Sequence, residues 1–422
     1  MPTAPKLSKL LLLLFLLSCG FISAQDSINS AIVEQKTYQL YLDKNWNELI
    51  KYGNKAVKKG FDYFYMQMRI GIAYYEKKNY CLAENHFRKA LKYSSTDELA
   101  QEYLYYCYLY NGRYEDARLL SKKFSKELAE KIGTNKQSSL AFLLVEGGTK
   151  ITDSLNYYDA NKKTRANYYD PAIYFQAGLN HYIKNRVSLF HAITYFDQQN
   201  FVSKVSQLQY YLKASVPIKN NWLISPAFHW VSIKNTSEIR PIPSGTMLPG
   251  PPPKTTTTVT NSNYFLGAIT VQKNIRKFVF SIGTTVSNIN NVTQYIHSGF
   301  VGYSVLGNSK LVLGCSGYLN TIDGYSTTNT SVAPFIYLQP INKVSIKMSY
   351  FLNTKTNIIE DNGYLVNNSA DLTQSRWSVI GNFTINKQVS FYTLYQLEHK
   401  QELQQLFNYK YNIIVAGIKT SF

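Results

Sequence analysis

Six histidines are the side chains in this sequence best suited to acid–base chemistry or metal binding: His86, His181, His191, His229, His297 and His399. His181 and His191 lie on either side of a short turn, and no carboxylate lies between them to complete a site. The chain also lacks a phosphate-binding loop, a dinucleotide fingerprint and a nucleophile elbow. These patterns predict that the protein is not an enzyme and uses no cofactor or metal ion.

The cysteines fit neither a metal centre nor a disulfide-rich scaffold. Only 4 are present in 422 residues, and no two have the spacing of a metal-ligand pair. Cys81 and Cys107 fall within one helical region. They either form a disulfide in an oxidising compartment or remain small buried residues.

The N-terminus has the pattern of an export signal. Two lysines precede an apolar run from Leu10 to Leu17, which is too short to span a bilayer, and small residues follow before Gln25. We expect residues 1–24 to be a signal peptide. A lipobox-like segment offers an alternative in which Cys19 carries a lipid. No later apolar stretch approaches ~18 residues, so no transmembrane helix is expected.

Positive charge is the remaining chemical signal. The formal net charge is +19, and most of the excess lies beyond residue 136. Nucleic acid is an unsuitable partner for an exported chain. Anionic lipid head groups or an anionic solute fit this charge better.

Residues 26–135 have apolar positions at three- and four-residue spacings, as amphipathic helices do. The segment from Phe64 to Ser95 matches the packing positions of a tetratricopeptide repeat with Gly71, Tyr74, Ala83, Phe87 and Ala90. We expect three such repeats, the middle one regular, with a generic stack of helical hairpins as the alternative. Stacks of this kind hold protein partners on a concave surface.

From residue 139 to the end, the apolar period changes to two. Six tight turns with Asn or a basic residue recur, around Lys184, Asn220, Arg276, Asn308, Asn342 and Asn386. Six turns join twelve strands, and one more strand at each end makes about fourteen, an even number that leaves both ends of the barrel on one side. The pattern predicts an antiparallel transmembrane β-barrel over residues 139–422.

The connections opposite the tight turns are expected to be longer, polar outer loops. Examples are Thr149 to Tyr169, Lys234 to Thr260 and Asn353 to Asp371. The proline-rich stretch from Arg240 to Thr258 is not expected to pair as a strand, because proline lacks the backbone donor.

Polar faces of the predicted strands carry three basic residues, Lys213, Lys347 and Arg376. In a membrane barrel that face lines the lumen, so these charges predict a preference for anionic solutes. The alternative is that they pair with lipid phosphates or with other side chains.

The last strand ends with the alternating apolar residues Ile414, Ile418 and Phe422. It resembles the C-terminal strand of bacterial outer-membrane barrels, which the barrel-assembly machinery reads. The whole layout is similar to that of YaiO-type outer-membrane proteins and, in architecture, to polysaccharide-export porins. The resemblance implies an outer-membrane location with the repeats in the periplasm. Outer-membrane lipid, the assembly machinery and a periplasmic protein are then the expected partners.

This interpretation of the sequence leaves three candidate functions. The first is a pore or export component for a glycan or another anionic solute. The second is a non-conducting anchor that scaffolds an envelope complex. The third is a barrel enzyme acting on lipid, with His229 or His399 beside a serine or Glu398.

Overall fold

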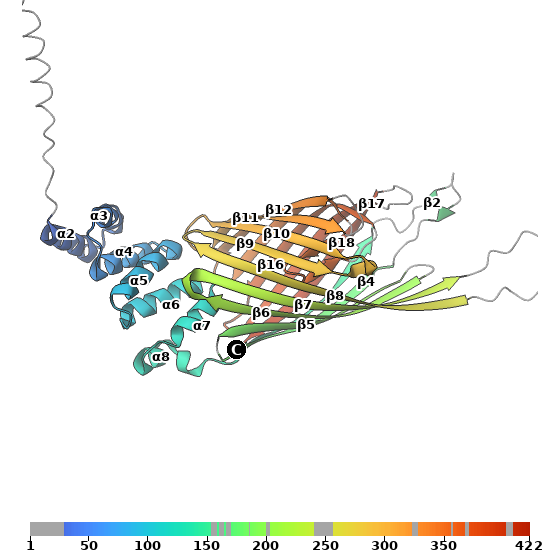
Figure 1. Ribbon diagram of the computed structural model, residues 1–422, viewed down its shortest axis with the longest axis horizontal. Coiled ribbons are helices and arrows are strands. Elements are labelled where there is room, and N and C mark those ends of the chain that lie inside the picture. The colour runs from blue at the N-terminus through green and yellow to red at the C-terminus, as the bar shows by residue number, and fades with distance from the viewer. Residues whose placement is uncertain are drawn as a thin grey trace, which may run out of the picture.

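The chain folds into a helical domain followed by a closed β-barrel (Figure 1). The computed structural model describes residues 29–152, 158–159, 164–165, 170–184, 186–199, 203–239, 256–322, 328–355, 358–367, 371–401 and 408–422. The expected signal peptide, Cys19 and the prolines from 241 to 253 lie outside these residues.

Seven α-helices form the N-terminal domain: α2 (Ser30–Leu42), α3 (Trp46–Lys58), α4 (Phe64–Glu76), α5 (Tyr80–Tyr93), α6 (Glu98–Tyr110), α7 (Tyr114–Ser121) and α8 (Lys126–Ile132). Short polar residues begin several of them. The side chains of Asn79, Asp97 and Ser125 each accept a hydrogen bond from a backbone N–H in the first turn, which satisfies a donor that has no partner within the helix. From α2 to α7, each helix packs on the next one, and α8 packs on α6. Among the described residues, no helix has the length and hydropathy needed to cross a bilayer.

The barrel contains fourteen antiparallel strands: β1 (Leu140–Thr152), β4 (Ala172–Ile183), β5 (Val187–Gln199), β6 (Ser203–Ile218), β7 (Trp222–Ile239), β8 (Thr256–Ile275), β9 (Phe278–Ser287), β10 (Gln294–Ser304), β11 (Leu311–Ile322), β12 (Thr328–Ile341), β13 (Val344–Lys355), β16 (Leu372–Thr384), β17 (Val389–Gln401) and β18 (Asn408–Ser421). Each strand pairs with its neighbour in sequence, and β18 closes the barrel against β1. This confirms the expected order of helices followed by a barrel of about fourteen strands.

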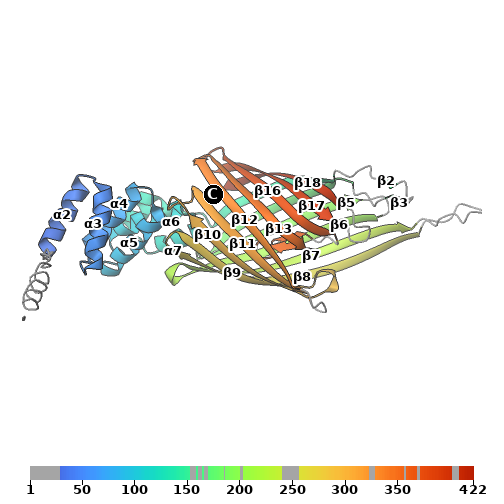
Figure 2. The same ribbon diagram turned by 90° about the horizontal axis from the view of Figure 1, so that it is seen from above.

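The two ends of the barrel differ. The six tight turns and both barrel termini lie at the end that carries the helical domain, which we call the proximal end (Figure 2). Several turn residues have positive φ, including Lys184, Asn220, Arg276 and Gly307. Asn and Gly adopt this conformation at little cost, which explains their recurrence in the tight turns.

Two expectations about the opposite, distal end were wrong. The predicted loops are too long: residues 149–152 belong to β1 and residues 234–239 to β7, and Thr256, Thr257 and Thr258 of the proline-rich stretch pair with β7 as the start of β8. The segment from Asn353 to Asp371 was expected to be an outer loop. Its middle instead forms a hairpin of β14 (Ile358–Glu360) and β15 (Leu365–Asn367) that folds into the barrel. A second short pair, β2 (Tyr158–Asp159) and β3 (Thr164–Arg165), lies beyond the distal end (Figure 1).

The barrel wall is apolar outside and polar inside. Ile282 is 70% exposed and Phe265 is 50% exposed on the outer face. Gln176, Ser188 and Asn320 are buried on the inner face. This distribution is the inverse of that in a soluble barrel, whose apolar side chains fill the interior.

Candidate functional site

The β14–β15 hairpin crosses the lumen and contacts the wall through its tip. Asn362 accepts a hydrogen bond from the Thr270 hydroxyl at 2.6 Å and donates one to the Ser225 carbonyl at 2.9 Å. Next to it, the Gly363 carbonyl accepts a hydrogen bond from His229 Nδ1 at 2.7 Å. The tip is therefore attached to β7 and β8, across the lumen from the strands that carry the hairpin.

A second set of contacts holds the side of the hairpin. The Tyr364 hydroxyl accepts a hydrogen bond from Gln176 on β4, and Tyr211 on β6 donates to the Asn362 carbonyl at 3.3 Å. Ile359 is 1% exposed and packs in an apolar cluster with Val231, Leu266 and Ile296 of the wall. An apolar cluster shared by the hairpin and the wall shows that the hairpin is packed as part of the interior.

The base of the hairpin is fixed by a charge pair. Arg376 Nη2 on β16 donates to both carboxylate oxygens of Glu360, at 2.6 and 2.8 Å. Lys150 and Lys400 lie 3.8 and 3.9 Å from the neighbouring carboxylate of Glu398. Charges buried together in this way hold one another in place, and removing one partner is costly.

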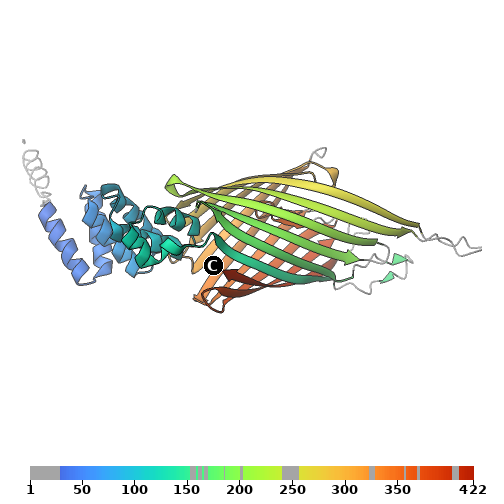
Figure 3. The same cartoon turned by 90° about the horizontal axis from the view of Figure 1, so that it is seen from below.

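The helical domain lies against the proximal end of the barrel (Figure 3). The Cys81 N–H donates to the Gly307 carbonyl at 2.9 Å, and the Asn308 side chain donates to the Lys78 carbonyl at 2.9 Å. On a second turn, the Asn221 amide donates to Glu84 at 2.8 Å. The domain therefore rests on the β6–β7 and β10–β11 turns.

A buried ion cluster stiffens this contact. Arg113 Nη1 lies 2.6 Å from Glu84, and its Nη2 lies 2.7 Å from Asp116. Arg113 and Glu84 are both buried. Burial opposes the charged guanidinium, but the carboxylates of Glu84 and Asp116 raise the pKa of Arg113 above its ordinary value. Because Asn221 of the barrel also bonds Glu84, the cluster spans both domains.

Between the hairpin and the helical domain lies a chamber of about 840 Å³. Glu115 in the first turn of α7 reaches it from the proximal side, and Asp361, Asn362 and Tyr364 of the hairpin reach it from the distal side. Burial raises the pKa of the Glu115 carboxyl above its ordinary value, an effect that the nearby Lys213 partly offsets.

Several aromatic rings of the lumen wall lie over glycines. A Cβ atom on Gly417 would lie 2.5 to 2.7 Å from ring atoms of Tyr392 on the paired strand. A Cβ atom on Gly314 would lie 2.4 Å from the Phe335 ring, and one on Gly178 would lie 3.1 Å from the Phe190 ring. Glycine on one strand thus allows a large ring on the next strand to lie along the wall.

The structure places the three predicted basic residues on the inner face. Lys213 lines the chamber. The Lys347 ammonium lies 5.1 Å from the centre of the Phe335 ring, and Arg376 is paired with Glu360. Two of the three therefore have partners within the lumen, and their effect on solute selection stays a prediction.

The predicted packing and assembly residues lie in the expected elements. Ala83, Phe87 and Ala90 are fully buried, and a Cβ atom on Gly71 would lie 2.7 Å from the Phe87 ring. Tyr74 stacks on His86. Ile414, Ile418 and Phe422 lie on the outer face, about half exposed, and the Phe422 N–H donates to the Ala141 carbonyl of the first strand.

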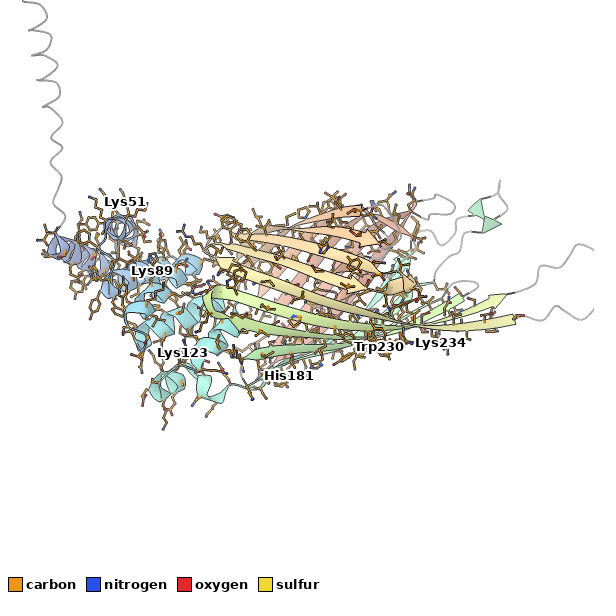
Figure 4. The ribbon with its side chains drawn as sticks, viewed as in Figure 1. Lys51, Lys89, Lys123, His181, Trp230 and Lys234 are labelled. Carbon is orange, nitrogen blue, oxygen red and sulfur yellow. The ribbon has the colours of Figure 1, made fainter. Side chains whose placement is uncertain are left out.

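The histidines do not come together. His181 and His191 stack on the outer face near the proximal end, where Figure 4 labels His181. His229 points inward to the hairpin. His399 and Glu398 are adjacent in β17 and therefore point to opposite faces of the wall. Among the described residues, no group of three or more His, Cys, Asp or Glu side chains could hold a metal ion. The thiols of Cys81, Cys107 and Cys315 are free.

The sequence analysis did not identify the hairpin residues or Glu115 as part of a functional site. A signal for the hairpin was present, because Asp361-Asn362-Gly363 is a tight-turn sequence. All three residues have positive φ. No comparable signal marks Glu115, whose position depends on how the two domains dock.

The chain matches no protein-family model, and no curated protein is similar to it in sequence. Several solved structures share the barrel fold at low identity. A FadL homologue of Pseudomonas aeruginosa is 10% identical, with 68% of this chain and 91% of that chain covered and a TM-score of 0.40. The toluene transporter TodX of P. putida is 7% identical, with 71% and 95% covered and a TM-score of 0.43. The Acinetobacter baumannii outer membrane protein Omp33 is 9% identical, with 68% and 100% covered and a TM-score of 0.35.

Proposed function

We propose that this protein is an outer-membrane β-barrel whose lumen is a gated path for a polar solute. The observation that carries the proposal is the inverted wall, with an exposed apolar outer face and a polar inner face. Exposure of so many apolar side chains to water would promote aggregation, whereas lipid solvates them. Only helices and closed barrels satisfy their backbone hydrogen bonds in a bilayer.

The helical domain would then lie in the periplasm and serve as a docking module for a protein partner. Short turns of outer-membrane barrels face the periplasm and long loops face outward. The helical domain lies at the end with the short turns. Its helix pairs contain the buried small and aromatic residues from which tetratricopeptide repeats are predicted.

Two obstructions support a gated path rather than an open one. The hairpin crosses the lumen, and α7 reaches into the chamber from the proximal end. Solute passage would require at least the hairpin to move. A glycan or another polar solute is the class of cargo we propose, because hydroxyl and amide groups line the path.

Planar-bilayer recording tests the proposal. Wild-type protein should show low or brief conductance, and a variant with Ile358–Asn367 replaced by a short Gly-Ser linker should conduct steadily. Glu360→Gln, which breaks the pair with Arg376, should raise the frequency of opening. Glu127→Gln removes an exposed carboxylate from α8 and should change nothing.

The same recordings test selectivity. If Lys213, Lys347 and Arg376 favour anions, the reversal potential in a salt gradient should show it, and replacing all three with Gln should reduce it. A barrel that folds but stays closed after the hairpin is removed would refute the pore. The second candidate, a non-conducting anchor that scaffolds an envelope complex, would then be the better account.

A further inference from the structure

The chamber between the hairpin and α7 has the size and the walls of a binding site. Its volume of about 840 Å³ falls within the ~300–1,000 Å³ range of small-molecule sites. It lies between two structural units that could separate, the hairpin and the helical domain. A ligand held here would lie on the solute path, so this inference rests on the proposed function.

Aromatic platforms form part of the chamber wall. Tyr392 and Phe190 occupy the space beside Gly417 and Gly178, so each ring lies close to the wall. Both rings also line the chamber, and Phe190 meets the Tyr364 ring of the hairpin edge to face, with 5.8 Å between the ring centres. Phe300, another lining residue, stacks on Phe335 at 5.7 Å between ring centres. Flat rings along a wall suit ligands that have flat apolar faces.

Neutral hydrogen-bonding groups lie between these rings. Hydroxyls and amides from many of the strands line the chamber, among them Asn180, Ser215, Thr270, Gln272, Ser298 and Asn382. Such groups both donate and accept hydrogen bonds. A purely hydrocarbon ligand would displace water from these groups and leave them without partners, which costs free energy. The wall therefore suits a ligand rich in hydroxyl groups.

The charges that line the chamber are balanced. Lys213 and Lys419 oppose Glu115 and Asp361. The Lys419 ammonium lies 4.2 Å from the centre of the Phe142 ring, and Lys213 lies close enough to Glu115 to affect that carboxyl. With two charges of each sign, the chamber has no net field that would require an ionic ligand.

We propose that the chamber binds neutral sugar rings, held by stacking on the aromatic platforms and by hydrogen bonds from the hydroxyls and amides. A sugar ring combines an apolar face of C–H groups with a rim of hydroxyls, which matches this alternation of rings and polar groups. The volume fits a short oligosaccharide segment.

Calorimetric titration of the full chain tests this proposal. The protein is purified in lauryldimethylamine oxide, because sugar-headed detergents would compete. Cellotriose and maltotriose are the neutral probes, and trigalacturonate is the anionic one. We expect at least one neutral trimer to bind at one site per chain and more tightly than the anionic trimer. Binding of the anionic trimer alone, or of none, overturns the proposal.

Variants locate the site. Tyr392→Leu should weaken trimer binding by several-fold to about tenfold. Tyr395→Leu, on the same strand but on the outer face, should leave it unchanged. Equal effects of the two variants would refute the chamber as the site. Heat-modifiable migration on gels checks folding, and Phe300→Leu replaces Tyr392→Leu if the latter does not fold.

The outcomes separate this inference from the pore itself. If the barrel conducts after hairpin removal but binds no trimer, the sugar site is refuted and the pore is supported. If the barrel binds the trimer but never conducts, the sugar site is supported and the pore is refuted.

Discussion

Single glycines decide where the large rings of the lumen lie. Tyr392 occupies space that exists only because residue 417 has no side chain. The same arrangement recurs at Gly178 and Gly314 with their neighbouring phenylalanines. At the residue scale, the shape of the lumen therefore depends on pairs of one small and one large residue on neighbouring strands.

We expect Gly417→Ala to destabilise the barrel by about 1–3 kcal/mol, because the new methyl group displaces the Tyr392 ring. Combining it with Tyr392→Leu should recover much of this loss, so a double-mutant cycle on urea unfolding should give a clear coupling energy. Gly317→Ala is the matched control, since a Cβ atom there meets nothing within 4 Å. Equal losses at both glycines would contradict the packing argument.

His86 gives the helical domain a specific pH response. Burial lowers its pKa to about 4, and its Nδ1 lies 2.6 Å from the Gln67 side-chain oxygen. The unfolded chain binds the proton near 6.5. Between about pH 6.5 and 4 the unfolded state therefore holds more protons, and the free energy of unfolding falls as the pH is lowered.

Thermal unfolding of the helical signal should show this loss in wild type between pH 7 and 5. His86→Gln, which cannot titrate in this range, should lose less stability over the same interval. The raised pKa values of Glu115 and Asp116 act in the opposite direction, and they are present in both proteins. If the unfolding midpoints of the two proteins change with pH in parallel, His86 is not the group responsible for the loss of stability.

At the scale of elements, the helix pairs depend on close contact between α4 and α5. Ala83 is fully buried there. We expect Ala83→Arg to cost about 3 kcal/mol or more, because a charged side chain cannot be accommodated without separating the helices. The midpoint of helical unfolding by circular dichroism measures the loss.

A matched control for that change is Leu99→Arg on α6, where the side chain is half exposed. It introduces the same charge into the same domain and should change stability little. If both variants unfold at the wild-type midpoint, Ala83 does not lie in a tight contact.

The elements could be predicted from the sequence to different degrees. Alternation and turn residues located the strands, because side-chain direction along a strand has a strict period of two. The inward fold of β14–β15 could not be located in this way. The Asn362-Gly363 turn indicates a hairpin, but whether it points outward or into the lumen depends on partners such as Thr270 and Arg376, far away in the chain.

At the scale of the whole molecule, the docking of the two domains could not be predicted from local sequence patterns either. Asn308 bonds the Lys78 carbonyl, and Asn221 bonds Glu84. Such contacts depend on the final arrangement of segments that share no sequence periodicity. The barrel itself was predictable because an even strand count and tight turns on one side already constrain its topology.

The proposed orientation predicts which end of the molecule is accessible from outside the cell. In a background lacking Cys81, Cys107 and Cys315, Thr257→Cys at the distal end should react with an impermeant maleimide on intact cells. Asn386→Cys, in an exposed turn at the proximal end, should react only after the outer membrane is opened. The reverse pattern would place the helical domain outside the cell.

The closure of the barrel between β1 and β18 has a consequence for the order of folding. These strands are the first and last of the barrel, so their pairing joins the most distant parts of it. Contacts in the helical domain are mostly between neighbouring helices, and local contacts form much faster than distant ones. The helical domain should therefore be complete before the barrel is closed. Its contacts with the β6–β7 and β10–β11 turns can then hold these two hairpins at one end while the first and last strands are still separate.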